Sequence, residues 1–304
     1  MNYEYRINVR DDDVLRASFN QLTKQVFAFD FEDWYRRGYW GTKYIPHVLI
    51  DNGEVIANVS ANEIDFIIDG QKKRLIQLGT VMTNDAYRKQ GLGRYIMEQI
   101  LEKYKGKADG IYLFGNDSVL EYYPKFGFQK YEQYQYYISM DGTGDRSQNS
   151  VGRELLRQVD MSDKKDCEQV LHTIENNISD DQVLMVDNLG LYMFYLAGGP
   201  MGDMVYEVAM EAGNVYAVLE QEANQLMIHQ IFADCEIDRR YVIDLICQEY
   251  VGKVTEIKLG FTPHKTEGLL KRKLYVVDST FWGMGDDMKR FGEEGMMFPT
   301  LSHA

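Results

Sequence analysis

The sequence predicts an α/β (α+β) protein made of two related domains. The chain has 304 residues, which is long for one compact α/β domain and gives each of two domains enough residues to bury its own core. A helix-and-strand pattern recurs at a fixed spacing, which indicates an internal duplication. A polar segment rich in turn-forming residues separates the two copies and predicts a linker.

The repeated unit consists of an amphipathic helix followed by an apolar strand. Residues 94–104 resemble residues 240–250 at an offset of 146 positions, and the same offset relates the apolar strands 110–115 and 256–261. Apolar residues recur at helical spacing in both helices. A match of this length without gaps predicts the same helix-strand unit in both halves.

A hairpin precedes each copy of this unit. Residues 47–57 and residues 208–217 each turn at a glycine, and the glycines are 160 positions apart. The two offsets differ by 14 residues, so the second copy is shorter between its hairpin and its helix. If strand 75–82 corresponds to 226–233, part of the loss falls in the loop that enters the helix. We therefore expect the function of the first copy to reside in that loop.

The polar segment defines the expected domain limits. Residues 141–152 are rich in Gly, Asp, Ser and Asn, which favours a linker. The sequence thus predicts a first domain at 1–140, a linker at 141–152 and a second domain at 153–304.

The charge composition favours some classes of binding partner over others. The formal net charge is −14 and the sequence pI is about 4.9. Nucleic-acid binders gain most of their affinity from Lys and Arg side chains that neutralise phosphates, so this balance argues against a nucleic-acid partner. A cationic partner would suit the chain better, although acidity also serves solubility alone.

The first residues and the cysteines indicate the compartment. Residues 1–10 show no basic stretch followed by an apolar run, and no later segment has the length of a membrane span. Cys167, Cys235 and Cys247 form no C-x-x-C pair, so neither a disulfide framework nor a zinc site is expected. These features predict a cytoplasmic protein without a membrane partner or a bound metal.

A glycine-containing basic loop joins a predicted strand to a predicted helix. It reads Arg88-Lys89-Gln90-Gly91-Leu92-Gly93 and lies between strand 75–82 and helix 93–105. Two glycines let the backbone turn tightly, so that N–H groups and the helix N-terminus face an anion, while Arg88, Lys89 and Arg94 add positive charge. This pattern predicts a pyrophosphate site. The alternative is an ordinary strand-to-helix turn.

A second motif follows the next predicted strand, 110–115. It begins at Asn116, reaches Tyr123 after seven residues, and continues through Gly127 and Phe128. The first loop resembles the R-x-x-G-x-G signature of the GNAT acetyltransferases, and this second stretch resembles the Asn and Y-x-x-x-G-F motif of the same superfamily. Residues 1–140 are accordingly identified as a member of that superfamily.

The resemblance implies a fold and an activity. Each half would be a GNAT-like domain with a mixed, mostly antiparallel central sheet flanked by helices, and the second would be a degenerate copy. The first domain would be an acyl-CoA-dependent N-acetyltransferase. It would move an acetyl group from acetyl-CoA to a primary amine of a small molecule or peptide by direct attack in a ternary complex, without a metal.

The resemblance also assigns roles to residues. Strand residues 80–83 would offer backbone groups to the pantetheine arm of CoA, the loop would bind the pyrophosphate, and Tyr123 would protonate the leaving thiolate. A backbone N–H near Val81 would stabilise the oxyanion. The alternative for Tyr123 is a packed aromatic side chain. The donor-binding residues expected in this way are Thr80, Val81, Met82, Thr83, Arg88, Lys89, Gln90, Gly91, Leu92, Gly93, Arg94, Asn116 and Tyr123.

The sequence departs from the family pattern at the position where several members carry the general base. Several members carry a Glu fourteen residues before the first loop glycine, where this chain has Gln77, which cannot act as a base. Glu63 and Asp65 are alternatives, although each also fits a solvated strand residue. A further candidate is the C-terminus, Ala304 carboxylate or His303, because the related tandem enzymes of the enhanced-intracellular-survival type insert their terminal carboxylate into the active site. Phe298 and Leu301 would anchor this tail.

The acceptor region is expected in the first helices, which are rich in aromatic residues interspersed with Asp30, Glu32 and Asp33. Aromatic faces beside carboxylates would suit an amine or ammonium group. Trp34 and Tyr35, with Gln77, are the residues expected to contact the acceptor, and Phe27 less so. The alternative is that most of these rings form the core.

The second copy and the rival functions complete the expectations. Residues 234–239 contain three acids and no glycine where the phosphate loop would lie, so the second copy should bind no CoA and should complete the acceptor cleft. The rivals are an acyl-CoA-binding sensor without catalysis and a transferase of a longer acyl or aminoacyl group. The sequence leaves open the acceptor and the oligomeric state, a homo-oligomer included.

Overall fold

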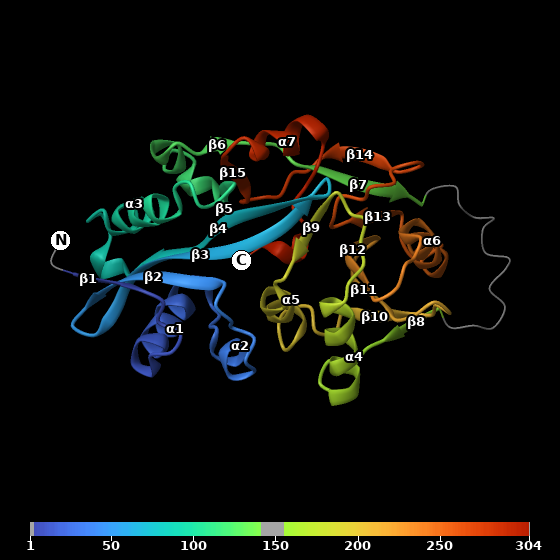
Figure 1. Ribbon diagram of the computed structural model, residues 1–304, viewed down its shortest axis with the longest axis horizontal. Coiled ribbons are helices and arrows are strands. Elements are labelled where there is room, and N and C mark those ends of the chain that lie inside the picture. Colours follow the sequence, from blue (N-terminus) through green and yellow to red (C-terminus); the bar gives the residue numbers. More distant parts are fainter. Residues whose placement is uncertain (1–2, 141–154, 304) are drawn as a thin grey trace.

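Two mixed sheets lie toward opposite ends of the long axis of the computed structural model (Figure 1). The structure describes residues 3–140 and 155–303. In the first sheet the strand order is β1-β2-β3-β4-β5-β15-β6, with β9 beside β3, and in the second it is β14-β7-β13-β12-β11-β10-β8. The predicted α/β class with two mixed, mostly antiparallel sheets is confirmed.

The first sheet and its helices come mainly from the first half of the chain. Its elements are β1 (Glu4–Ile7), α1 (Asp13–Phe27), α2 (Glu32–Arg36), β2 (Tyr44–Asp51), β3 (Glu54–Ile68), β4 (Gln71–Thr83), α3 (Leu92–Tyr104), β5 (Gly110–Gly115), β6 (Gln129–Lys130), β9 (Val183–Val186) and β15 (Thr280–Met284). Helices α1 and α2 cover one face of this sheet, and α3 covers the other (Figure 1).

The second sheet comes mainly from the second half. Its elements and the helices around it are β7 (Tyr134–Ser139), β8 (Leu156–Gln158), α4 (Lys164–Glu175), α5 (Leu189–Leu196), β10 (Val205–Val208), β11 (Val215–Glu222), β12 (Gln225–Ala233), α6 (Arg239–Glu249), β13 (Glu256–Leu259), β14 (Leu270–Lys273) and α7 (Asp287–Glu294). No helix among the described residues is long and apolar enough to cross a membrane.

The predicted repeat is present in both sheets. The order β2-β3-β4-α3-β5 recurs as β10-β11-β12-α6-β13, with antiparallel pairs followed by one parallel pair, β4 with β5 and β12 with β13. The parallel pair needs the crossover helix, because two parallel strands cannot be joined by a tight turn. The strand expected at 226–233 is β12.

Three strands pair with strands of the other half of the chain. β7 from the first half pairs with β13 and β14, while β9 and β15 from the second half pair with β3 and β5. Residues 280–284, late in the second half of the chain, therefore form β15 of the first sheet. The division of strands between sheets does not follow the predicted domain limits at 140 and 153, and the predicted linker 141–152 lies outside the described residues.

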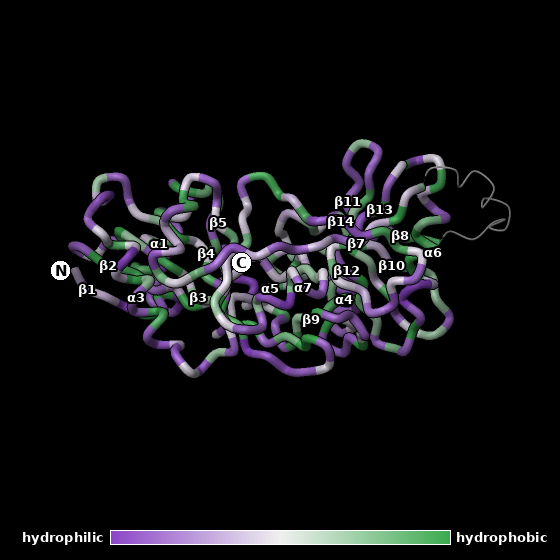
Figure 2. Tube along the Cα trace, turned by 90° about the horizontal axis from the view of Figure 1, so that it is seen from above, coloured by the Kyte–Doolittle hydropathy of each residue, from purple (hydrophilic) through white to green (hydrophobic). Residues whose placement is uncertain are grey.

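The two halves also share a core. Tyr112 of β5 stacks on Phe298 of the C-terminal tail, with ring centroids 4.1 Å apart, and Phe298 stacks on Phe291 of α7 at 4.2 Å. The last described residues lie near the middle of the molecule, between the sheets, in two perpendicular views (Figures 1 and 2). Phe298 and Leu301 are fully buried, so the anchoring expected for this tail is confirmed.

Candidate active site

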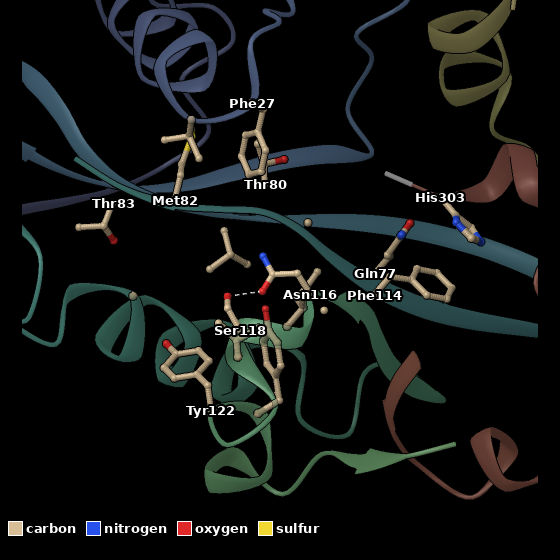
Figure 3. Close-up of a pocket in the computed structure, with 18 of the residues that line it drawn as sticks. Phe27, Gln77, Thr80, Met82, Thr83, Phe114, Asn116, Ser118, Tyr122 and His303 are labelled. Atoms are coloured by element: carbon tan, nitrogen blue, oxygen red, sulfur yellow. Dashed lines mark hydrogen bonds between the residues drawn. The ribbon is translucent and has the colours of Figure 1, made fainter. Parts of the chain in front are cut away.

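A cavity of about 1110 Å³ lies where β4 and β5 separate (Figure 3). Residues from both halves of the chain line it, which makes the second half part of its wall. The lining residues come from α1, the segment after it, α2, β2, β4, the loop into α3 and its first turn, the end of β5 and the turns after it, α5, and the tail: residues 26, 27, 29, 31, 34, 44, 77–83, 87–89, 91–94, 114–116, 118, 119, 122, 123, 191, 194, 195 and 303.

The separation of β4 from β5 exposes backbone groups to the cavity. The two strands pair only at Leu75–Leu78 with Gly110–Leu113. On the other side of β4 the register with β3 shifts at Thr80 and Val81, and Thr80 has a φ of 47°. Asn58 Nδ2 donates a hydrogen bond of 2.8 Å to Thr80 O, which holds this bulge. A bulge of this kind turns backbone groups out of the ladder and toward a ligand.

The loop before α3 has the geometry of an anion site. Gly91 adopts a φ of 77°, which favours glycine, and no side chain caps the first turn of α3. Arg88 pairs with Asp85 at 2.8 Å and Arg94 with Glu98 at 3.0 Å. The uncapped N–H groups and the helix dipole are therefore available to a phosphate.

Twelve of the thirteen donor-binding residues expected from the sequence line this cavity. The exception is Gln90, which is not part of the lining, and its Oε1 accepts a hydrogen bond of 3.0 Å from Tyr3 OH. Gln90 holds the loop against the start of the chain instead.

Tyr123 lies in the cavity wall with only 5% of its surface exposed. A Cβ at Gly115 would lie 2.7 Å from Tyr123 Cε2, so the glycine makes room for the ring. Trp282 of β15 contacts the same ring, with centroids 6.1 Å apart. Burial raises the pKa of Tyr123 to about 12, so the hydroxyl is protonated at neutral pH and is able to donate a proton.

Asn116 follows β5 and faces the cavity beside Ser118 (Figure 3). Ser118 Oγ donates a hydrogen bond of 2.5 Å to Asn116 Oδ1, which orients the amide. The amide NH₂ group is thereby directed away from Ser118, where it can serve as a donor to a carbonyl of the pantetheine arm.

The structure does not bring the carboxylates of Glu63 and Asp65 to the cavity. Glu63 accepts a hydrogen bond of 2.9 Å from Tyr104 OH of α3, and Asp65 accepts one of 3.1 Å from Arg74. Neither residue lines the cavity. The placement expected for Glu63 and Asp65 is therefore wrong, because the strand register turns both toward other partners. Gln77 does line the cavity, is 1% exposed, and has no hydrogen-bond partner for Oε1 among the described residues.

The tail reaches the cavity at His303. The imidazole ring stacks on Phe114 with centroids 4.0 Å apart, and Tyr195 OH donates to the backbone oxygen of His303. Burial lowers the pKa of His303 to about 4, so the ring is neutral at neutral pH. Ala304, whose carboxylate was the other candidate, lies outside the described residues.

Only some of the aromatic residues expected to contact the acceptor line the cavity. Trp34 lines the cavity, and its Nε1 donates a hydrogen bond of 2.8 Å to Gly190 O. Tyr35 does not line it, because its ring lies under the Arg16 guanidinium at 3.7 Å. Phe27, expected to be the less involved, lines the cavity with 42% of its surface exposed. The expectation for Tyr35 is thus wrong.

Sequence reasoning missed the contribution of α5. Leu191, Phe194 and Tyr195 of this helix line the cavity opposite the first domain. A signal was present, since residues 189–196 are apolar on every side of the helix, which predicts burial between two layers. Tyr122 was also missed. Its hydroxyl lies 3.3 Å from the position of a Cβ on Gly93, so this glycine lets the ring approach the loop.

The equivalent gap in the second sheet is filled by the chain itself. β12 and β13 pair only at Gln225–Ile228 with Glu256–Leu259. Beyond this point Arg239 Nη2 donates 2.8 Å to the backbone oxygen of Ile231, and the backbone N–H of Thr300 donates 2.8 Å to Gly260 O. The backbone groups that face the cavity in the first copy are bonded to protein atoms in the second.

Comparison with known proteins agrees with this geometry. Residues 11–128 match the model of the acetyltransferase (GNAT) family. Residues 11–128 are thus a GNAT domain, as the two motifs in this part of the chain indicated, and the family match supports an N-acyltransferase in general terms. No curated protein matches the sequence.

Solved structures share the fold over nearly the whole chain. A conserved protein of unknown function from Enterococcus faecalis V583, a probable N-acyltransferase, is similar with a TM-score of 0.62 and 12% identity, covering 96% of this chain and 74% of its own. Eis1 from Mycobacterium abscessus has a TM-score of 0.57 and 12% identity, over 91% and 73%. A GCN5-related N-acetyltransferase from Kribbella flavida has 0.55 and 13%, over 92% and 71%. At these identities the likeness concerns the fold.

Proposed function

We propose that the protein is an N-acetyltransferase that moves the acetyl group of acetyl-CoA to a primary amine of a small molecule or peptide. One observation carries this proposal: a single cavity joins the uncapped N-terminus of α3, the free edge of β4, Tyr123 and an aromatic region. The first two features suit a pyrophosphate and an extended pantetheine arm, and the last suits a second substrate.

The reaction needs no covalent enzyme intermediate. The neutral amine nitrogen attacks the thioester carbonyl carbon, and a backbone N–H at the Thr80–Val81 bulge stabilises the oxyanion. When the C–S bond breaks, Tyr123 OH protonates the thiolate, while the nitrogen releases a proton and Tyr123 is reprotonated from solvent. Holding both substrates in one cavity supplies much of the rate enhancement.

The acceptor ammonium must first lose its proton, and Gln77 cannot take it. We propose that the tail supplies this step, through His303 or the Ala304 carboxylate. Removing only residues 303–304 leaves the buried anchors Phe298 and Leu301 in place. We expect kcat to fall while the Kd for acetyl-CoA and the thermal unfolding temperature stay unchanged. Full activity of the truncated protein would eliminate the tail as the base.

An acyl-CoA sensor is the second candidate, and Gln77 is the observation that favours it, because a sensor requires no base. The test is thiol release from acetyl-CoA over a panel of primary amines, followed by initial rates at varied concentrations of both substrates. The proposal predicts amine-dependent release and intersecting reciprocal plots, as expected for a ternary complex. Tight binding of acetyl-CoA without release on any amine would favour the sensor.

A further inference from the structure

The acceptor end of the cavity differs in charge from the donor end. The Arg and Lys residues that line the cavity all belong to the donor end, in the loop before α3 and the first turn of this helix: Arg88, Lys89 and Arg94. No Asp or Glu is found among the described residues that line the cavity. The net negative charge of the chain therefore lies elsewhere than on the walls that an acceptor would touch.

The acids expected beside the acceptor are engaged outside the cavity. Glu32 Oε2 accepts from Arg16 Nε at 3.1 Å, and Asp33 Oδ2 accepts from Arg37 Nε at 2.7 Å. Asp30 Oδ1 accepts from the backbone N–H of Glu32 at 3.0 Å. These carboxylates stabilise the short helix α2 and hold it against the first half of α1. The expectation that they would face an ammonium group is therefore wrong.

Rings from both halves form the acceptor end instead. We call Phe27, Phe29, Phe31, Trp34 and Phe194 the aromatic compartment; all five line the cavity. Phe194 of α5 contacts Phe31 with ring centroids 5.7 Å apart, Trp34 at 5.5 Å and Phe29 at 6.1 Å. Because Trp34 Nε1 is already bonded to Gly190, the compartment offers ring surfaces to a ligand.

Two polar atoms without partners lie at one end of the cavity. Gln77 Oε1 and His303 Nε2 are buried and have no hydrogen-bond partner among the described residues. Figure 3 shows both side chains at the same end of the pocket, with Phe114 beside them. Gln77 Oε1 is an acceptor whose burial without a donor costs free energy, which an N–H donor from a bound ligand would recover, and His303 Nε2 would accept a second N–H in the tautomer protonated at Nδ1. A neutral primary amine supplies such donors.

We propose that the acceptor is a primary amine carried on one aromatic or alkyl body, and not a polyamine or aminoglycoside. The inference rests on the proposed acetyl transfer. The apolar body would fill the aromatic compartment, and the amine would lie near Gln77 and His303. The rings could attract one cation, but each additional primary ammonium group of a polycation would lose its hydration without an Asp or Glu among the described lining residues to pair with.

The test is an acceptor comparison with acetyl-CoA as donor. Phenethylamine and hexylamine are compared with ethylamine, spermidine and kanamycin, with thiol release as the readout. Burial of a ring or hexyl chain should raise kcat/KM about 10- to 100-fold over ethylamine. The value for phenethylamine should change less than about twofold between 0.05 and 0.5 M salt, because no long-range charge attraction assists its binding.

Variants at the compartment rim sharpen the test. Phe27 is partly exposed, so Phe27→Ala should fold normally and raise the KM for phenethylamine about tenfold, with a smaller effect for ethylamine. Phe27→Glu should lower phenethylamine turnover further and raise activity on spermidine. Tyr241→Ala is the matched control, since Tyr241 is an exposed aromatic residue of α6 outside the cavity, and it should change neither value.

The outcomes separate this inference from the proposed function. Thiol release that is fastest with spermidine or kanamycin would overturn the inference and leave acetyl transfer intact. A preference for octanoyl-CoA over acetyl-CoA that Phe27→Ala abolishes would also overturn it, because the compartment would then hold the acyl chain. Absence of release with every amine, despite binding of acetyl-CoA, would contradict the proposed function itself.

Discussion

The two copies keep one strand order and differ in the gap between their parallel strands. Between β4 and β5 the gap opens into the cavity, whereas between β12 and β13 it is closed by Arg239 and Thr300. The closure uses hydrogen bonds to the same strand edge that faces the cavity in the first copy. The two copies thus share the strand order, and internal contacts in the second copy occupy the place of the cavity in the first.

The helix N-termini show the same difference. Helix α3 follows Gly91 and has no side-chain cap, while α6 follows Asp238, whose carboxylate accepts a hydrogen bond of 3.1 Å from the backbone N–H of Arg240. A capping carboxylate occupies the position that a phosphate would need and repels it. The second copy therefore lacks both the free helix terminus and the free strand edge.

Closure of the second gap also positions the tail. Thr300 bonds to Gly260 through its backbone and to His229 through Oγ1, at 2.9 Å from Nδ1. Three residues later, His303 reaches the cavity of the first copy. The second copy thereby supports the segment that brings His303 to the cavity.

The largest expected effect concerns Tyr123 in the open copy. Removing the hydroxyl in Tyr123→Phe should lower kcat about 10²- to 10⁴-fold, because a positioned general acid is lost. The Kd for acetyl-CoA should stay within about twofold, since the ring remains. Steady-state kinetics and calorimetry measure the two effects, with Tyr241→Phe in the second copy as control. An unchanged kcat would reduce Tyr123 to a packing role.

A large loss of stability is expected in the closed copy. Arg239 is buried with its Nη1 3.3 Å from the buried Asp181 carboxylate, and burial raises the pKa of Asp181. Arg239→Met should lower the free energy of unfolding by about 3–5 kcal/mol, because Asp181 would be left without its cation. Urea unfolding measures this loss, and adding Asp181→Asn should recover part of it. A changed affinity for acetyl-CoA in Arg239→Met, without this loss of stability, would contradict a purely structural role for Arg239 in the second copy.

The sequence was informative where function depends on local spacing. The loop around Gly91 and the Tyr123 motif are short segments whose geometry is set by neighbouring residues, so both could be placed in advance. Glu63 could not, because a shift of one residue in strand register turns a side chain to the other face. Residues from α5 and the strand β15 reach the first sheet through contacts far apart in sequence, and no local pattern specifies which sheet an apolar strand will join.

A moderate effect is expected at the loop of the open copy. Gly91 has a positive φ with open space around its Cα, so Gly91→Ala introduces strain of about 1 kcal/mol without a clash. We expect the Kd for acetyl-CoA to rise about fivefold, with kcat nearly unchanged at saturating donor. Gly252→Ala carries the same strain outside the cavity and is the control. Equal Kd values for both variants would show that the loop geometry is irrelevant to binding.

The smallest effect is expected in the pH dependence of kcat/KM, which should be set by the pKa of the acceptor amine. The pKa of His303 is lowered to about 4 and that of Tyr123 is raised to about 12. His303 is thus neutral and Tyr123 protonated throughout pH 6 to 9. The rise of kcat/KM in this range should follow deprotonation of the acceptor amine, and an acceptor with a lower pKa should shift the limb to lower pH by the same amount. If kcat/KM rose at the same pH for all acceptors, the titrating group would instead belong to the enzyme.

We infer that the open copy alone binds the acyl donor. Calorimetric titration of the full chain with acetyl-CoA tests it most directly, in parallel on the wild type, on Gly91→Ala and on Arg239→Met. We expect one site per chain, with a higher Kd in Gly91→Ala and an unchanged Kd in Arg239→Met. Two sites per chain, or a single site lost only in Arg239→Met, would contradict it.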